Sequence, residues 1–289
     1  MDSWSTVRTD LALEARESME EKAEGLHGVV VEEDYDEASD VHITKVIIET
    51  KNGAKMLGKP MGVYITLEAP TMTEPEEEYH QEISAILARE LKSVLPDPDR
   101  EQSILVVGLG NREVTADSLG PNVVDNLLVN RHIVREYGKV AYNRSKMHQI
   151  SSLVPGVMAK TGMESAEIIR GVIGETKPDM VIVIDALAAR STKRLNRTIQ
   201  ITNTGIHPGS GVGNHRNAIT QESLNVPVLA LGVPTVVDAA TIVGDAMGER
   251  PVALKELNNM YVTTKDVDQQ IQQISHIICD GINKALDTV

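Results

Sequence analysis

The sequence contains no phenylalanine, and aromatic residues make up only 2% of its 289 positions. Aliphatic side chains and methionine must therefore fill the core and any interface between subunits. The N-terminus has no signal-peptide-like apolar core, and no apolar run approaches the roughly 20 residues that cross a bilayer. These absences predict a cytoplasmic protein that has no membrane partner.

Metal-binding motifs are equally scarce. The single cysteine, Cys279, lies in an apolar helix-like pattern, so we interpret it as a core residue and expect no disulfide within the chain. The sequence has neither an H-E-x-x-H string nor a C-x-x-C pair, and it lacks the D-T-G motif of pepsin-like proteases. The sequence therefore predicts no standard zinc site, and we expect no cofactor.

Positive charge is also in deficit. Lysine and arginine number 28 against 42 aspartates and glutamates, which gives a formal net charge of -14. An excess of this size repels phosphates and anionic headgroups. We therefore expect no direct nucleic-acid binding, and we expect a basic protein partner to be attracted more readily than an acidic one.

What the chain does contain is an alternation of apolar runs and helical patterns. The runs Ser103–Val107 and Met180–Ile184 are continuously apolar, which is typical of parallel strands with helices on both faces. Val41–Glu49 and Val63–Glu68 predict an N-terminal β elaboration. We therefore predict a three-layer α/β fold with a largely parallel sheet, in one domain. The other expected elements are strands at Ile150–Val154, Thr198–Ile201 and Val226–Leu231, and helices at Leu11–Ala23, after Pro75, and at Pro121–Val134, Glu164–Ile173, Val236–Ala246 and Asp266–Leu286.

A glycine-containing turn, Gly108-Leu109-Gly110, follows the first of these parallel strands. A dinucleotide fingerprint requires a third glycine where Glu113 stands, with a helix opening there. The loop instead continues to Gly120, so we interpret the glycines as a tight turn off the strand. A non-catalytic nucleotide or small-molecule binding protein remains the alternative that this turn leaves open.

Two aspartates follow predicted parallel strands. Asp117 lies in the loop after Ser103–Val107, and Asp185 directly follows Met180–Ile184. Alone, Asp117 could cap the next helix, and Asp185 could end its strand or pair with Arg190. Because ligands of open α/β sheets bind at the carboxyl ends of the strands, the two carboxylates are better interpreted as a pair. Two neighbouring carboxylates can share one proton, so one can deprotonate a water while the other donates a proton.

A glycine-rich loop extends from Thr204 to Asn214 and includes His207 and Ser210. Ser210 lacks the G-x-S-x-G frame of a hydrolase nucleophile, since Pro208 occupies the first glycine position. His207 could be a base or a metal ligand. We interpret the loop mainly as a turn-rich segment that shapes a pocket.

Several long strings of this sequence resemble the germination protease family of spore-forming bacteria. The similarity runs over nearly the whole chain. The strings are Val7-Arg8-Thr9-Asp10-Leu11-Ala12, Val106-Val107-Gly108-Leu109-Gly110-Asn111, Asp117-Ser118-Leu119-Gly120-Pro121, Pro155-Gly156-Val157-Met158, Ile184-Asp185-Ala186-Leu187-Ala188-Ala189-Arg190, Thr204–Asn214 and Gly232-Val233-Pro234-Thr235-Val236-Val237-Asp238-Ala239.

The resemblance implies an endopeptidase that degrades small acid-soluble spore proteins during germination, in the spore core. It implies a zymogen that removes a short propeptide by autoprocessing and assembles as a homotetramer. It also implies a core similar to that of hydrogenase maturation proteases and an atypical aspartic mechanism, in which the two essential aspartates match Asp117 and Asp185. A metal-dependent maturation-type protease on the same core, with His207 as a further ligand, remains an alternative.

The expected processing site is the Asp10–Leu11 bond. It joins an acidic residue to an apolar one. The same resemblance implies that the family cleaves bonds of this kind. Residues 1–10 would then form a propeptide and residues 11–289 a single protease domain. An acidic residue before the bond predicts a basic pocket, for which the candidates are Arg190, Lys160 and Arg194, with His207 as a further substrate-binding candidate. The alternative role of Asp10 is to cap a helix that starts at Leu11.

Overall fold

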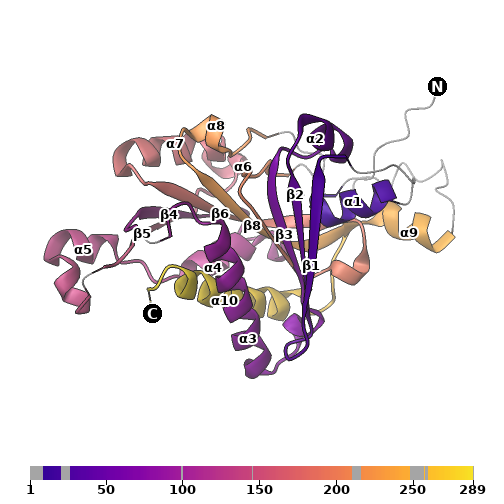
Figure 1. Ribbon diagram of the computed structural model, residues 1–289, viewed down its shortest axis with the longest axis horizontal. Coiled ribbons are helices and arrows are strands. Elements are labelled where there is room, and N and C mark those ends of the chain that lie inside the picture. Colours follow the sequence, from indigo (N-terminus) through magenta and orange to yellow (C-terminus); the bar gives the residue numbers. More distant parts are fainter. Residues whose placement is uncertain are drawn as a thin grey trace.

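The structure is a computed structural model that describes residues 9–20, 27–98, 100–144, 146–209, 216–247, 257 and 260–288. These residues contain one sheet of nine strands in the order β1-β2-β3-β7-β8-β6-β4-β5, with β9 paired to β8 (Figure 1). The strands are β1 Val29–Asp36, β2 Val41–Ile48, β3 Gly62–Glu68, β4 Ser103–Gly108, β5 Gln149–Leu153, β6 Met180–Ala189, β7 Thr198–Thr202, β8 Val228–Asp238 and β9 Tyr261–Val262.

The sheet has a parallel half and an antiparallel half. Strands β5, β4, β6 and β8 run parallel, whereas β1, β2, β3 and β7 are joined by antiparallel pairs. β7 pairs antiparallel with β8 and connects the two halves. The predicted α/β fold with an N-terminal β elaboration is confirmed, and the elaboration extends the same sheet.

Helices cover both faces of this sheet (Figure 1). Aliphatic side chains of α3, α4 and α10 pack on one face and form the largest core cluster. Side chains of α7 and α8 contribute to a second cluster on the opposite face of the parallel half. No helix in the described part of the chain is long and apolar enough to span a bilayer. The helices are α1 Ala12–Glu20, α2 Lys51–Leu57, α3 Glu77–Val94, α4 Leu119–Asn126, α5 Arg131–Tyr137, α6 Met158–Thr161, α7 Ser165–Thr176, α8 Gln221–Leu224, α9 Ala239–Met247 and α10 Val267–Ala285.

Several local expectations were wrong. The expected helix Pro121–Val134 is broken into α4 and α5, because Asn130 pairs with β5 instead of continuing the helix. The Asn130 side chain accepts a hydrogen bond from the Ile150 amide at 2.7 Å and donates one to the His148 carbonyl at 2.9 Å. The expected helix at Val236 begins only at α9, because β8 continues through Asp238. The sequence analysis also missed β1 and α2.

The expected end of β6 at Ile184 was wrong in a way that concerns the site. The strand continues to Ala189 and stays paired with β8, with a register irregularity between Leu187 and Ala188. On its other edge, the pairing with β4 stops at Ile184, whose partner is Gly108. Asp185 is therefore inside a strand, at the point where one neighbour ends and the other continues.

Candidate active site

The loop after β4 folds tightly against the start of α4. A side chain on Gly108 would place its Cβ 2.2 Å from the Gly120 carbonyl oxygen, and one on Gly110 would lie 2.0 Å from the Asp117 carbonyl oxygen. Gly110 also has a φ of +117°, which favours glycine. These glycines are therefore required for the loop to close on α4, in agreement with the interpretation as a tight turn.

Asp117 is held at the end of this loop by backbone contacts. It closes a short 3-10 turn before α4, and its carbonyl oxygen accepts a hydrogen bond from the Asn111 amide at 2.9 Å. The Thr235 hydroxyl of β8 donates to the Ala116 carbonyl at 2.6 Å. Ser118, not Asp117, occupies the N-cap position of α4. The Asp117 carboxylate is thus not needed as a cap.

Asp185 and Asp117 interact electrostatically. Asp185 is only 6% exposed. Burial raises the pKa of Asp185 well above its usual value, and the nearby charges of Asp117 and Asp10 raise it further. Burial also raises the pKa of Asp117, while the Arg216 guanidinium lowers the pKa of both aspartates. The structure therefore brings the predicted pair together and adds a cation that the sequence analysis missed.

The pair lies where the topology of the parallel half changes direction. β5 and β6 lie on opposite sides of β4, so the connections that follow β4 and β5 leave toward different faces of the sheet. Such a switch point leaves a crevice beyond the carboxyl ends of the strands, where open α/β sheets bind ligands. Asp117 follows β4, and Asp185 lies one residue beyond the last β4–β6 partner.

The Asp10–Leu11 peptide lies along the open edge of β6. The Asp10 amide donates to the Ala188 carbonyl at 3.2 Å, and the Ala188 amide donates to Asp10 Oδ2 at 3.0 Å. Leu11 is fully buried and packs against a small cluster that includes Leu187 and Ala189. The structure thus brings the expected processing site to the same strand that carries Asp185.

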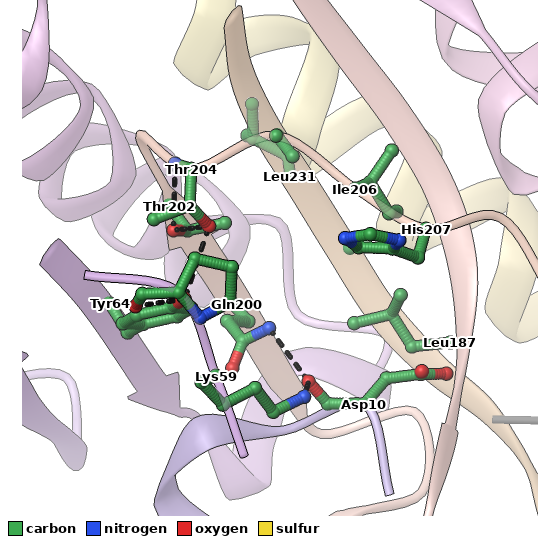
Figure 2. A pocket seen from close by; sticks show the side chains of 14 residues that line it. Asp10, Lys59, Tyr64, Leu187, Gln200, Thr202, Thr204, Ile206, His207 and Leu231 are labelled. Carbon is green, nitrogen blue, oxygen red and sulfur yellow. Dashed lines mark hydrogen bonds between the residues drawn. The ribbon is translucent and has the colours of Figure 1, made fainter. Parts of the chain in front are cut away.

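The carbonyl oxygen of Asp10 has two donors. Lys59 Nζ lies 2.8 Å from it, and Gln200 Nε2 lies 3.2 Å from it. The other end of the Gln200 amide accepts the Ala12 backbone N–H at 2.7 Å. Asp10, Lys59 and Gln200 line one pocket, and His207 lies opposite them (Figure 2). Of the substrate-binding candidates, His207 is therefore the one that the structure places in this pocket.

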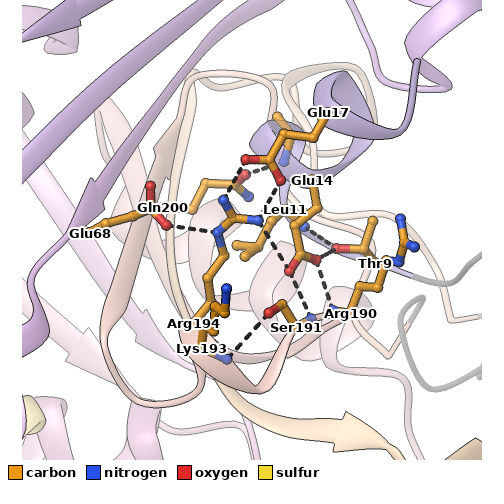
Figure 3. A network of polar contacts seen from close by, with 11 residues as sticks. Thr9, Leu11, Glu14, Glu17, Glu68, Arg190, Ser191, Lys193, Arg194 and Gln200 are labelled. Atoms are coloured by element: carbon orange, nitrogen blue, oxygen red, sulfur yellow. Dashed lines mark hydrogen bonds and ion pairs between the residues drawn. The ribbon is translucent and has the colours of Figure 1, made fainter. Parts of the chain in front are cut away.

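A polar network holds α1 to the turn after β6 (Figure 3). The buried Glu14 carboxylate accepts the Arg190 and Ser191 amides at 2.8 and 3.0 Å. Arg194 binds Glu17 at 2.6 and 2.7 Å and Glu68 at 2.8 Å. Although burial alone would lower it, these hydrogen bonds raise the pKa of Arg194. Arg194 is thus engaged by α1 and β3.

The other predicted site residues are dispersed. Lys160 forms an ion pair with Glu113, in the loop after β4. Arg190 contributes its backbone amide to Glu14, and Ser210 lies outside the described residues. Within the described ranges, no group of three or more His, Cys, Asp or Glu side chains is placed to hold a metal ion.

Sequence reasoning missed Lys59, Gln200 and Arg216. Gln200 carried a weak signal, because it is a polar residue inside the otherwise apolar end of a predicted strand. Arg216 follows the glycine-rich loop that had been singled out. Lys59 carried no signal, since its contact joins residues 49 positions apart.

The open sheet and the two interacting carboxylates at its switch point place this chain among the α/β proteins with a candidate acid–base site. Family models identify it further: the model described as germination protease matches residues 6–249. The chain therefore belongs to the germination protease family and is a protease.

Individual relatives agree with this assignment. The germination protease of Caldanaerobacter subterraneus subsp. tengcongensis is 43% identical, over 97% of this chain and 94% of that protein. The germination protease of Clostridium perfringens is 41% identical over 97% and 95%. The one from Bacillus mycoides is 46% identical over 84% of this chain and 66% of that protein.

Among solved structures, a NiFe hydrogenase maturation protease from Thermococcus kodakarensis aligns with 67% of this chain and 99% of its own. The identity is 14% and the TM-score is 0.35. A likeness at this level supports no inference about the site.

Proposed function

We propose that this protease uses Asp117 and Asp185 as an acid–base pair and first cleaves its own Asp10–Leu11 bond. The observation that carries the proposal is the position of that bond. Asp10 is hydrogen-bonded to the strand of Asp185, and its charge contributes to the raised pKa of Asp185. An acidic–apolar peptide therefore already lies beside the carboxylates.

The raised pKa values suit the chemistry. A buried and a half-buried carboxylate that repel each other hold one proton between them more readily than isolated ones do. The ionised member takes a proton from water as the water attacks the carbonyl carbon. The protonated member donates to the amide nitrogen as the C–N bond breaks, which leaves a carboxyl group on Asp10 and an amine on Leu11.

Holding the bond in cis favours the first cleavage. A segment attached to the enzyme reacts in an effectively unimolecular step, so no second protease is needed. Residues 1–10 would leave as a propeptide, and residues 11–289 would remain as one protease domain. The substrates that we propose are small acid-soluble spore proteins in the spore core, cut after an acidic and before an apolar residue, and the active form is a homotetramer.

Mass measurement of the purified full-length protein during incubation tests the proposal. The expected product begins at Leu11 and appears at a rate independent of protein concentration. The incubation is repeated with a chelator, and loss of cleavage there would favour the metal-dependent alternative. Intact mass after prolonged incubation, together with no cleavage of a peptide spanning the residue 10–11 junction, would contradict the proposed function. A new terminus at another residue would contradict the processing site alone.

A further inference from the structure

The two donors on the Asp10 carbonyl come from parts of the fold that are far apart in the sequence. Lys59 follows α2 in the antiparallel half, and Gln200 lies on β7. Both point into the pocket toward Asp10 (Figure 2). Both donate to the carbonyl oxygen of the bond that we expect to be cleaved, and Lys59 Nζ also lies 3.4 Å from the Thr9 carbonyl oxygen.

The register of the sheet relates Gln200 to the aspartate pair. Asp185 is directly opposite Gly232 on β8, and Gly232 is directly opposite Gln200 on β7. Residues paired in this way point to the same face, so the Asp185 and Gln200 side chains lie on one face with a glycine between them. The Leu187 side chain packs over Gly232 on this face. A Cβ on Gly232 would lie 2.5 Å from the Leu187 side chain.

Gln200 holds the peptide on both sides of the bond. Its Nε2 donates to the Asp10 carbonyl, and its Oε1 accepts the Ala12 amide. The Leu11 side chain between these two groups is fully buried. The orientation of the Asp10–Leu11 peptide plane is thereby fixed by one side-chain amide, the edge of β6 and Lys59.

We propose that Lys59 and Gln200 form the carbonyl-binding pair of the protease, which polarises the bond to be cut and stabilises the negative oxygen that forms on it. This inference rests on the proposed cleavage at Asp10–Leu11. It applies equally to substrates in trans, whose carbonyl before the cut bond would take the position of the Asp10 carbonyl.

The step balances without a further reactant. Water adds to the Asp10 carbonyl carbon and gives one proton to the ionised aspartate, while the carbonyl π electrons move onto the oxygen. Lys59 Nζ and Gln200 Nε2 donate hydrogen bonds to that oxyanion. When the carbonyl reforms, the C–N bond breaks and the Leu11 nitrogen takes the proton of the other aspartate. A charged donor strengthens its hydrogen bond as the oxygen becomes negative, so it acts more on the transition state than on the bound peptide.

The charge of Lys59 depends on its surroundings. Burial lowers the pKa of Lys59, while the carboxylates of Asp10 and Glu14 raise it again. Among the described residues, the other titratable groups that line the pocket are Tyr64 and His207. Burial raises the pKa of Tyr64 to about 12, so its phenol remains neutral while Lys59 titrates.

Three variants test the pair. Lys59→Met removes the ammonium and keeps most of the length of the side chain, Lys59→Arg keeps a cation, and Gln200→Glu removes the donor while retaining an acceptor for Ala12. Lys55→Met is the matched control, because Lys55 is an exposed lysine on α2. The measurements are the first-order rate of self-processing, and kcat and KM for a peptide that spans the residue 10–11 junction.

We expect Lys59→Met to lower the self-processing rate and kcat by about 10²- to 10³-fold, the usual effect of losing one oxyanion donor, with KM little changed. Lys59→Arg should recover part of the loss and move the alkaline limit of the rate to higher pH. Gln200→Glu should lower kcat, and Lys55→Met should match the wild type.

Docking of the segment must be measured separately. Hydrogen exchange at the Asp10 and Ala12 amides, in an Asp185→Asn background that remains uncleaved, reports whether the peptide still lies on β6. Normal protection with a slow rate supports the proposal. Wild-type rates in Lys59→Met would overturn it, as would a loss of protection that accounts for the whole decrease in rate. Absence of any cleavage by the wild type would instead overturn the proposed function itself.

Discussion

The two segments that meet at the candidate site are held in very different ways. The Asp117 loop closes through contacts at Gly108 and Gly110 that are too short to admit a side chain. The backbone of Asp117 is hydrogen-bonded within this loop. The segment from Thr9 to Glu17 is held mainly by side chains: Lys59, Gln200, Arg194 and its own Glu14. The aspartates are fixed by the backbone of their own loop and strand, whereas the peptide beside them is attached by side-chain hydrogen bonds and by the buried side chains of Leu11, Ala12 and Leu13.

This difference matches the proposed division between the catalytic carboxylates and the peptide to be cut. A catalytic group must keep its geometry through every turnover, and packing against the backbone provides that. Under the proposed cleavage only residues up to Asp10 leave, and Lys59, Gln200 and Ala188 hold Asp10 by hydrogen bonds that water can replace. Each prediction below changes one side of this comparison.

The largest effect should follow from the aspartates. Asp117→Asn and Asp185→Asn should each lower peptide cleavage by about 10³-fold or more, because an amide has the same shape but cannot exchange the proton. Asp125→Asn is the control, since Asp125 is an exposed ion-pair partner on α4. Activity would be followed with a peptide that spans the residue 10–11 junction. Folded variants with near-normal kcat would refute the two-aspartate mechanism.

Substitution of a glycine in the Asp117 loop should also cause a nearly complete loss of peptide cleavage. Gly110→Ala would place a methyl carbon 2.0 Å from the Asp117 carbonyl oxygen at a φ of +117°. It should cost roughly 1–3 kcal/mol of stability and displace Asp117. Gly171→Ala in α7 meets no atom within 4 Å. That change should stabilise by about 1 kcal/mol and keep full activity.

Denaturant unfolding and peptide cleavage of both glycine variants would check this pair. An active Gly110→Ala protein would mean that the close contact does not position the aspartate.

The strands of the parallel half of the sheet could be predicted from the sequence better than those of the antiparallel half. Apolar runs with no alternation identified β4 and β6, since both faces of these strands are covered. β1 was missed because only one of its edges is paired and most of its residues are exposed or partly exposed, so the apolar signal is weak. The extent of β6 was missed because Asp185 looked like a strand end, although it is buried beside Asp117 and is a candidate site residue.

The candidate site divides in the same way. Asp117 and Asp185 could be predicted because each follows a continuously apolar run of a parallel strand, and such positions meet at one edge of the sheet. Lys59, Gln200 and Arg216 could not be paired with them, since their contacts depend on how the N-terminal segment and the glycine-rich loop lie on the sheet. No local pattern encodes such contacts between distant positions.

A moderate effect on stability should separate burial from catalysis. Asp185 has a raised pKa in the folded state, so the folded protein binds more protons than the unfolded chain above the usual aspartate pKa. Stability contributed at this position therefore falls as the pH rises from the unfolded pKa toward the folded one. Asp185→Asn removes that loss and should raise Tm by a few degrees at pH 7, but not at pH 3.

Thermal unfolding of Asp185→Asn and wild type at both pH values provides the measurement. A variant less stable than the wild type at pH 7 would show that the carboxylate is stabilised in place, contrary to the electrostatics described above. Asp125→Asn serves again as the control and should show no such gain, because its carboxylate is half-exposed.

The smallest effect should come from the contacts that hold the N-terminal segment. Arg194→Met removes the ion pairs to Glu17 and Glu68 and the 3.5 Å ion pair to Glu14, but it leaves the two backbone donors on Glu14. Because Glu17 and Glu68 are partly exposed, the loss should be about 1 kcal/mol, or roughly fivefold faster cleavage of the segment by an added protease. Tm should fall by no more than a few degrees, since Arg194 binds the sheet only through the Glu68 side chain at the end of β3. The measurement uses the uncleaved Asp185→Asn background, and Arg100→Met, which loses an exposed ion pair elsewhere, is the control. Equal effects of both changes on the segment would mean that Arg194 does not attach it, and a large decrease in Tm would mean that these ion pairs stabilise the whole fold and not only the segment.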